Sequence, residues 1–217
     1  LMKSPKSYLH SLESESEPSQ PLIDGKLFHW LILEPHKFDE LVVVDVASKA
    51  SKIYKEAKAE HGEVYTTKEI ANAKALAEVL LKNEEVNDYL EGSSFEVPEI
   101  QMISGIPFRG KADIIKGKSI IDLKTTAKIS DFEYSANNFG YDLQAYLYLQ
   151  LFPEAENFVF ICIDKNTNDI GIYTCSNSFL ESGRRKLMKG IKDYKQFIAS
   201  GMDLEQHTIK KTLKGRI

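Results

Sequence analysis

The chain contains two neighbouring runs that decide its fold, Gly110-Lys111-Ala112-Asp113-Ile114-Ile115 and Ile120-Ile121-Asp122-Leu123-Lys124. Both are rich in β-branched residues, and the Lys116-Gly117-Lys118 segment between them is a turn signal, so we expect an antiparallel hairpin. Such a hairpin brings Asp113 and Asp122 toward the same end of a sheet. Because side chains alternate along a strand, Asp122 and Lys124 share one face and Leu123 points to the other.

An aspartate and a lysine two residues apart on a strand most often form a solvated edge pair. In this chain the pair directly follows the apolar Ile120-Ile121 run and faces a second aspartate, Asp113. Three charged groups at a buried end of a sheet are costly without a ligand, and a divalent cation held by carboxylate oxygens removes that cost. The pattern therefore favours a metal site over a surface ion pair.

Helical and strand patterns alternate on both sides of the hairpin. The spacing of apolar residues predicts helices over 5–12, 26–34, 47–60, 66–90, 139–151 and 178–201, with capping-box spacing at Thr66 and Glu69 and again at Ser178 and Glu181. Runs of β-type residues predict strands over 41–46, 95–103, 106–115, 119–123, 158–164 and 170–175. This order predicts an α/β (α+β) fold with a mixed central β-sheet flanked by helices.

The length of 217 residues suits one generous domain. We expect a single domain over 1–217, in which residues 1–25 form a short helix and an exposed loop, and residues 202–217 form a tail that either reaches a phosphate or frays. The first residues, Leu1 to Pro5, carry no apolar signal segment and read as the interior of a longer frame, so we expect further residues upstream.

Composition excludes several classes of protein. Hydrophobic residues are 42% and charged residues 28%, which argues against disorder, and no apolar run is long enough to span a bilayer, so we expect no membrane partner. The net charge of -4 argues against coating of nucleic acid by bulk charge, but not against a nuclease whose own carboxylates bind metal. Cys162 and Cys175 are too few for an iron–sulfur site and indicate reduced thiols in the cytoplasm, with a cross-strand disulfide as the alternative.

The motif of Asp113 followed by Asp122-Leu123-Lys124 resembles the core of the PD-(D/E)XK nucleases, which implies a restriction-endonuclease-like fold. Residues 5–201 are more widely similar to the RecE-type (exodeoxyribonuclease VIII-like) exonucleases of phages and prophages, in the RecB-like part of that superfamily. The matching segments are Ser4 to Leu9, Gly25 to Pro35 with its helical His29, Glu96 before a strand, Gly110 before Asp113, Gln144 and Tyr148 with Gln-x-x-x-Tyr spacing, and Gly183-Arg184-Arg185. Several motifs in the right order are far more specific than Asp-x-Lys alone.

The resemblance implies a metal site. Its implied ligands are His29, Asp113, Asp122 and the backbone carbonyl of Leu123. Carboxylate and carbonyl oxygens are the ligands that Mg²⁺ prefers, and the imidazole makes Mn²⁺ an acceptable substitute. We therefore expect Mg²⁺ as the cofactor.

The resemblance also implies a catalytic set around Asp113 and Asp122. Lys124 is expected to position the attacking water and to offset negative charge on the phosphate. Glu96 is expected as an outer or second-metal ligand. Gln144 and Tyr148 lie one helical turn apart and can therefore face the site together.

Several of these assignments have structural alternatives. His29 is also explained as a core histidine on an apolar helix, and Gln144 and Tyr148 as ordinary helix surface. Glu99 competes with Glu96, and three residues along a strand place the two on opposite faces. The distance from Glu96 to the Gly110 motif suits the RecB-like pattern, so we prefer Glu96.

Basic residues in two places are candidates for DNA phosphates. Arg109 and Lys111 lie on the same strand face as Asp113, so their geometry is tied to the site and they are the expected DNA contacts. The last predicted helix carries a basic stripe at Arg185, Lys189 and Lys192. Such a stripe is more often a solvated face.

Taken together, the resemblance implies a Mg²⁺-dependent exonuclease that degrades one strand of linear double-stranded DNA, 5′ to 3′, in recombination. The implied partners are double-stranded DNA ends, further copies of the chain in a ring, and a single-strand annealing protein. A RecB-like nuclease of other polarity or a structure-specific endonuclease is the alternative enzyme. A non-catalytic DNA-binding module is the alternative outside enzymes, but such a module has no physical reason to keep three uncompensated charges together.

Overall fold

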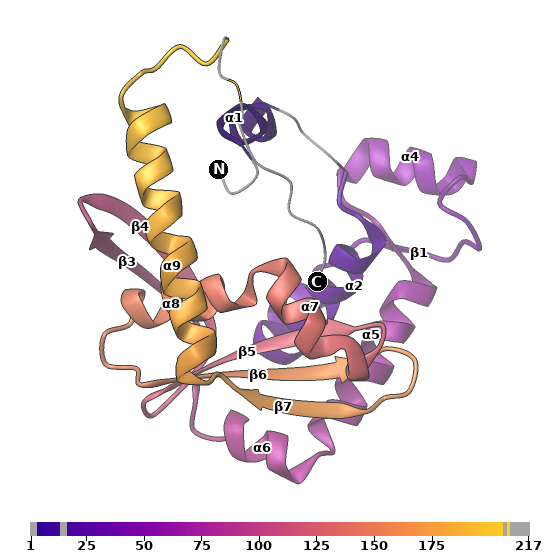
Figure 1. Cartoon of the computed structure of the whole chain (residues 1–217). Helices are drawn as coiled ribbons and strands as arrows, with labels where there is room; N and C mark the ends of the chain where they lie inside the picture. The colour runs from indigo at the N-terminus through magenta and orange to yellow at the C-terminus, as the bar shows by residue number, and fades with distance from the viewer. Residues whose placement is uncertain (1–3, 14–16, 206–207, 209–217) are drawn as a thin grey trace, which may run out of the picture.

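The computed structural model describes residues 4–13, 17–205 and 208. Its centre is a five-stranded sheet with the order β3-β4-β5-β6-β7 (Figure 1). The strands are β3 (Ser94–Ile103), β4 (Ile106–Lys116), β5 (Ser119–Thr126), β6 (Asn157–Asp164) and β7 (Ile170–Thr174). Neighbouring strands run antiparallel, except that β5 and β6 are parallel. The prediction of an α/β fold with a mixed central sheet is confirmed.

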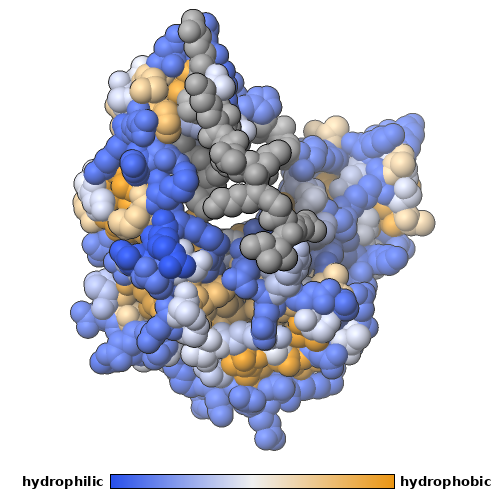
Figure 2. Space-filling view, viewed as in Figure 1, coloured by the Kyte–Doolittle hydropathy of each residue, from blue (hydrophilic) through white to orange (hydrophobic). Residues whose placement is uncertain are grey.

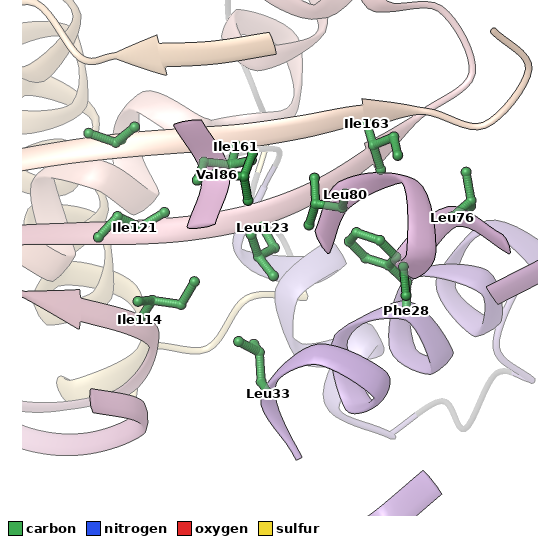
Figure 3. Close-up of a cluster of buried hydrophobic side chains, with 12 residues drawn as sticks. Phe28, Leu33, Leu76, Leu80, Val86, Ile114, Ile121, Leu123, Ile161 and Ile163 are labelled. Carbon is green, nitrogen blue, oxygen red and sulfur yellow. The ribbon is translucent and has the colours of Figure 1, made fainter. Parts of the chain in front are cut away.

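Helices cover both faces of this sheet. On one face α2 (Gln20–Leu33), α5 (Thr67–Leu81) and α6 (Glu84–Leu90) pack over the apolar cluster drawn in Figure 3. On the other face lie α7 (Phe132–Phe139), α8 (Tyr141–Leu151) and α9 (Asn177–Tyr194). Successive residues of β6 alternate between the two layers, with Ile161 in the first and Phe160 in the second. A parallel strand buried on both faces explains why its sequence is continuously apolar.

Short elements complete the fold. They are α1 (Pro5–Glu13), α3 (Pro35–Asp39), α4 (Lys52–His61), a two-stranded parallel sheet of β1 (Val43–Val44) and β2 (Tyr65–Thr66), the turn η1 (Ile129–Asp131) and the π-helical turn η2 (Lys195–Ala199). Within the described residues, no helix is both long and apolar enough to cross a membrane. The surface in Figure 2 is mostly hydrophilic, with scattered hydrophobic patches. Both cysteines are free, so the alternative disulfide is absent.

Two helix boundaries near the N-terminal half differ from the prediction. The expected loop before Gly25 is wrong, because α2 already begins at Gln20, with Pro21 in the first turn, where its missing N–H costs nothing. The single helix expected over 66–90 is two helices, because Asn83 ends the first run and caps α6 by accepting the N–H of Val86 at 2.9 Å. The capping box of Thr66 and Glu69 is confirmed.

Other boundaries shift for local reasons. Gly140, with φ of 76°, separates α8 from an unpredicted helix, α7. Ser176, not Ser178, caps α9, and the helix ends at Tyr194, before Gly201. The strand expected over 41–46 shrinks to Val43–Val44, because β2 offers it a partner of two residues. Most of the predicted tail, residues 206–207 and 209–217, lies outside the described residues.

A fork between β4 and β5 positions the candidate site. The last cross-strand pair that joins these strands is Ile114 with Ile121. Beyond it β5 continues beside β6 to Thr126, whereas β4 continues with β3 as a two-stranded ribbon. Asp113 and Asp122 are the first residues of the two strands past that last pair, so both aspartates stand at the opening of the fork.

Candidate metal and catalytic site

Asp113 bridges the opening of the fork. Its Oδ2 accepts the backbone N–H of Leu123 at 2.9 Å. Because the two strands have already separated, the carboxylate takes the place that a backbone acceptor has in a paired ladder. The side chain is 16% exposed, so this charged group is largely removed from water.

His29 reaches the fork from α2. Its Nε2 lies 2.7 Å from the carbonyl oxygen of Leu123, and its Nδ1 lies 3.5 Å from Oδ2 of Asp113. Helix α2 runs close to β5 one turn earlier, where a Cβ on Gly25 would lie 3.9 Å from Oγ1 of Thr125. Both ring nitrogens of His29 therefore face polar atoms of the fork, which is unlike a histidine that merely fills a core.

Glu96 enters the same space from β3. Phe95 pairs with Ile114 and Val97 with Ala112, so Glu96 stands opposite Asp113 in the register although the two do not pair. Its φ of 53° is a left-handed conformation that residues with a side chain rarely adopt. One donor atom from each of His29, Glu96 and Asp113 lies within 4.8 Å of the others. Its rival Glu99 instead accepts the N–H of the adjacent Ile100.

The electrostatics of this group fit a divalent cation. Burial and the nearby charge of Asp122 raise the pKa of Asp113 to about 6, which means that its ionised form is disfavoured. An imidazole nitrogen and two carboxylate oxygens are donors that Mg²⁺ and Mn²⁺ accept. The group can therefore hold such a cation, which would relieve the repulsion. The side chain of the predicted ligand Asp122 is not among these three, and the carbonyl oxygen of Leu123, the other predicted ligand, lies 2.7 Å from Nε2 of His29.

Asp122 and Lys124 form an ion pair on β5, beside this group. Asp122 is 5% exposed; its Oδ1 accepts a side-chain N–H of Gln144 at 2.5 Å, and its Oδ2 faces the Lys124 ammonium. That ammonium lies 5.1 Å from the ring centroid of Tyr141. Burial lowers the pKa of Lys124, but the Asp122 carboxylate outweighs burial and raises the pKa, so Lys124 is a fixed positive charge.

Helix α8 supplies Gln144 and Tyr148 to different parts of the site. Tyr148 donates from Oη to the carbonyl oxygen of Lys111 at 3.1 Å and so contacts the backbone of β4. Gly110 lets α8 lie this close, because a Cβ there would come within 2.7 Å of Leu151 and 3.3 Å of Tyr148. Neither Gln144 nor Tyr148 is ordinary helix surface.

Comparisons with known sequences and structures identify the family and the fold of the chain. Residues 1–203 match the family described as "PDDEXK-like domain of unknown function (DUF3799)". The chain belongs to this family. The PDDEXK-like domain is similar in fold to a candidate exonuclease from Eubacterium rectale, with a TM-score of 0.69 and 18% identity over 94% of this chain and 80% of that one. At that identity the likeness concerns the fold.

A phage-related exonuclease from Haemophilus somnus 129PT also matches, with a TM-score of 0.38 and 18% identity over 73% of this chain and 92% of that one. No curated protein matches the PDDEXK-like domain.

The two predicted phosphate contacts of the PDDEXK-like domain differ in their surroundings. Arg109 is exposed and has no ion pair within the part of the chain that the structure describes. Lys111 contacts Glu96 and lies 3.5 Å from Glu34. On α9, Lys189 pairs with Asp193, as expected of a solvated face.

Glu34 is the site residue that sequence reasoning missed. It belongs to the Leu-Glu-Pro segment at the end of α2 and is 15% exposed. The segment itself is part of the motif around His29, but nothing local in the sequence connects Glu34 with Lys111.

Proposed function

We propose that this PDDEXK-like domain is a divalent-metal-dependent deoxyribonuclease that acts as an exonuclease on linear double-stranded DNA. One observation carries the proposal: the fork gathers His29, Glu96 and Asp113 into a donor set for a cation, beside the partly buried ammonium of Lys124. A bound cation and the Lys124 ammonium would repel each other at this short range, which does not suit a purely structural site. They do suit a site that binds a phosphate between them.

The chain's own residues divide into those that hold a metal and those that act on the substrate. His29, Glu96 and Asp113 would hold the cation, with Asp122 and the carbonyl oxygen of Leu123 as further ligands. A bound Mg²⁺ or Mn²⁺ supplies polarisation of the scissile phosphate and a more acidic water. The N–H of Leu123 keeps Asp113 oriented toward the fork.

Lys124 is the group that we assign to the reacting phosphate. Asp122 and the ring of Tyr141 hold its ammonium in place, so it does not need to reorganise during the reaction. From there it orients the attacking water and offsets the negative charge that develops on the phosphate. Gln144 acts through Asp122, because its N–H fixes the carboxylate that holds Lys124.

We assign DNA binding to the two-stranded ribbon of β3 and β4. Arg109 and Lys111 precede Asp113 on the same face of β4, so they would contact phosphates that flank the scissile one. Several acidic residues of this chain, whose net charge is -4, would be neutralised by metal. The DNA-facing surface is then more positive than the net charge suggests.

The finer parts of the proposal rest on the resemblance to RecE-type exonucleases. They are degradation of one strand from 5′ to 3′, a role in recombination in the cytoplasm, a ring of identical subunits around DNA, and delivery of the single strand to an annealing protein. A single nuclease domain over 1–217 belongs to the same proposal.

The test compares end-labelled linear duplex with a covalently closed circle in the presence of Mg²⁺. We expect the linear DNA to shorten, the circle to stay intact, and the choice of labelled end to report the polarity. Lys124→Ala and Asp113→Asn should both abolish the activity while remaining folded. Linear DNA that stays intact with the wild-type protein would refute the proposed nuclease activity. Cleavage of the circle would show that the enzyme is an endonuclease and not an exonuclease.

A further inference from the structure

Lys111 lies between two carboxylates that come from distant parts of the chain. Its ammonium contacts Oε2 of Glu96 on β3 and lies 3.5 Å from Oε2 of Glu34, where α2 ends and α3 begins. The side chains of both glutamates are 15% exposed. Two nearly buried carboxylates therefore share one ammonium.

Glu96 also has a second possible partner, a cation, because it is one of the three residues whose donor atoms converge at the fork. A divalent cation bound by Glu96 places a double positive charge beside the ammonium of Lys111. Like charges at such short range repel, although the Lys111 side chain is 47% exposed and water screens part of the repulsion. Either Lys111 leaves Glu96 when the cation arrives, or the cation binds weakly.

We propose that Glu34 receives the Lys111 ammonium when Glu96 binds the cation. Metal occupancy at the fork then decides which of the two glutamates holds Lys111. Glu34 is a positioning residue in this scheme, since it acts on the metal site through its neighbours Lys111 and Glu96. The inference rests on the metal site of the proposed function.

Glu34 is well placed for this role. It directly follows α2, the helix that brings His29 to the fork, so its position is tied to the metal site. The ring of Pro35 restricts the backbone that follows it. Its Oε1 lies 2.6 Å from the ammonium of Lys37, which leaves Oε2 for Lys111. A carboxylate has room for several donors, so it can accept both ammonium groups.

Under this exchange Lys111 has a role both with and without a cation at the fork. Without a cation, Lys111 neutralises Glu96, which would otherwise add a further negative charge beside Asp113 and Asp122. With a cation bound, Lys111 is released from Glu96 but stays on the strand face that carries Arg109. Because an ammonium has three N–H donors, Lys111 can contact Glu34 and a phosphate next to the scissile bond at the same time.

Calorimetric titration with Mn²⁺ tests the exchange without DNA and without activity. The wild type, Glu34→Gln, Lys111→Met and the double variant form a double-mutant cycle. Glu34→Gln should weaken Mn²⁺ binding about tenfold, because Lys111 then has no other acceptor and stays on Glu96. In the Lys111→Met background the same substitution should change the affinity by less than about twofold. Glu40→Gln, which removes an exposed carboxylate just after α3, is the matched control and should bind like the wild type.

Two results would overturn the inference: no loss of affinity in Glu34→Gln, or an equal loss in both backgrounds, which would mean that Glu34 acts only through its own charge. A wild-type protein that binds no Mn²⁺ would instead refute the metal site of the proposed function. If Glu34→Gln does not fold, as judged by circular dichroism, Lys37→Met replaces it. Freeing Glu34 from Lys37 should tighten Mn²⁺ binding only while Lys111 is present, and an equal effect without Lys111 would refute the exchange.

Discussion

The carboxylate of Asp113 accepts the backbone N–H of Leu123 at 2.9 Å, one residue past the last pair between β4 and β5. A side chain that is expected to bind metal thus also completes the hydrogen bonding of the sheet at the point where the strands part. The site and the fold are coupled through this contact. A change at Asp113 should therefore be visible in stability as well as in metal binding.

Asp113→Asn should stabilise the metal-free protein at high pH. Burial and Asp122 raise the pKa of Asp113 from 3.8 to about 6, so the folded state holds this proton more tightly than the unfolded state. The stabilising effect of that proton is complete below the unfolded pKa and is lost as pH rises through about 6. At about pH 8 the asparagine variant should be more stable by about 2 kcal/mol, with little difference near pH 4.

Thermal unfolding in the presence of a chelator measures this difference. Added Mn²⁺ should then raise the melting temperature of the wild type and not that of Asp113→Asn, because a ligand stabilises only the state that binds it. If the difference in stability between the wild type and Asp113→Asn were the same at both pH values, the raised pKa could not belong to Asp113.

Gln144→Leu should reduce activity far more than stability. Its N–H is a hydrogen-bond donor to Oδ1 of Asp122, and without it the carboxylate that positions Lys124 loses one of its two partners. Loss of such a supporting contact typically costs about 10- to 100-fold in activity. Single-turnover hydrolysis of linear duplex measures the effect, and Gln150→Leu, an exposed position on the same helix, is the control. Similar rates for the two variants would refute the role of Gln144.

The strands and the acidic residues of the fork were predictable because their signals are local. The hairpin turn at Gly117 and the alternation of apolar residues set the register, and the register alone puts Asp113 and Asp122 side by side. The motif spacing then adds Glu96 and His29, whose donor atoms the structure brings within 4.8 Å of Asp113.

The rest was not predictable because it depends on tertiary packing. The break between α5 and α6 interrupts an apolar pattern that continues through it, so only the cap at Asn83 marks it. Glu34 and Lys111 meet because the end of α2 packs beside the ribbon, and no sequence period joins two residues so far apart. The positive φ of Glu96 lies within a strand, where no turn signal in the sequence marks it.

Gly183→Ala should destabilise the protein, whereas Gly190→Ala on the same helix should not. A Cβ at Gly183 would lie 1.9 Å from the carbonyl oxygen of Asp142, so α9 and α8 would have to move apart. Such overpacking typically costs about 1–3 kcal/mol. A Cβ at Gly190 meets no atom within 4 Å, and alanine there should stabilise the helix by up to about 1 kcal/mol. Urea unfolding of both variants is the measurement, and changes of the same sign would contradict the tight α8–α9 contact.

Glu69→Gln should destabilise the protein at neutral pH and progressively less in acid. Glu69 is 7% exposed, and its carboxylate accepts the N–H of Thr66 at 2.8 Å and faces the ammonium of Lys49 at 2.6 Å. Burial raises the pKa of Glu69, but these donors and Gln20 outweigh it and hold the pKa below 4.5. Because the folded pKa is depressed, the carboxylate stabilises the fold above the unfolded pKa, and this contribution is lost as pH falls through the folded pKa.

The expected loss for Glu69→Gln at about pH 7 is about 1–2 kcal/mol, the size of a helix cap with an added charged partner. Urea unfolding from neutral to acid pH measures it. Glu78→Gln is the control, because Glu78 is an exposed residue of the same helix whose contact with Lys82 is screened by solvent and contributes little. A loss at Glu69 that did not shrink in acid would contradict the role of its charge, since glutamine preserves the shape and removes only the ionised oxygen.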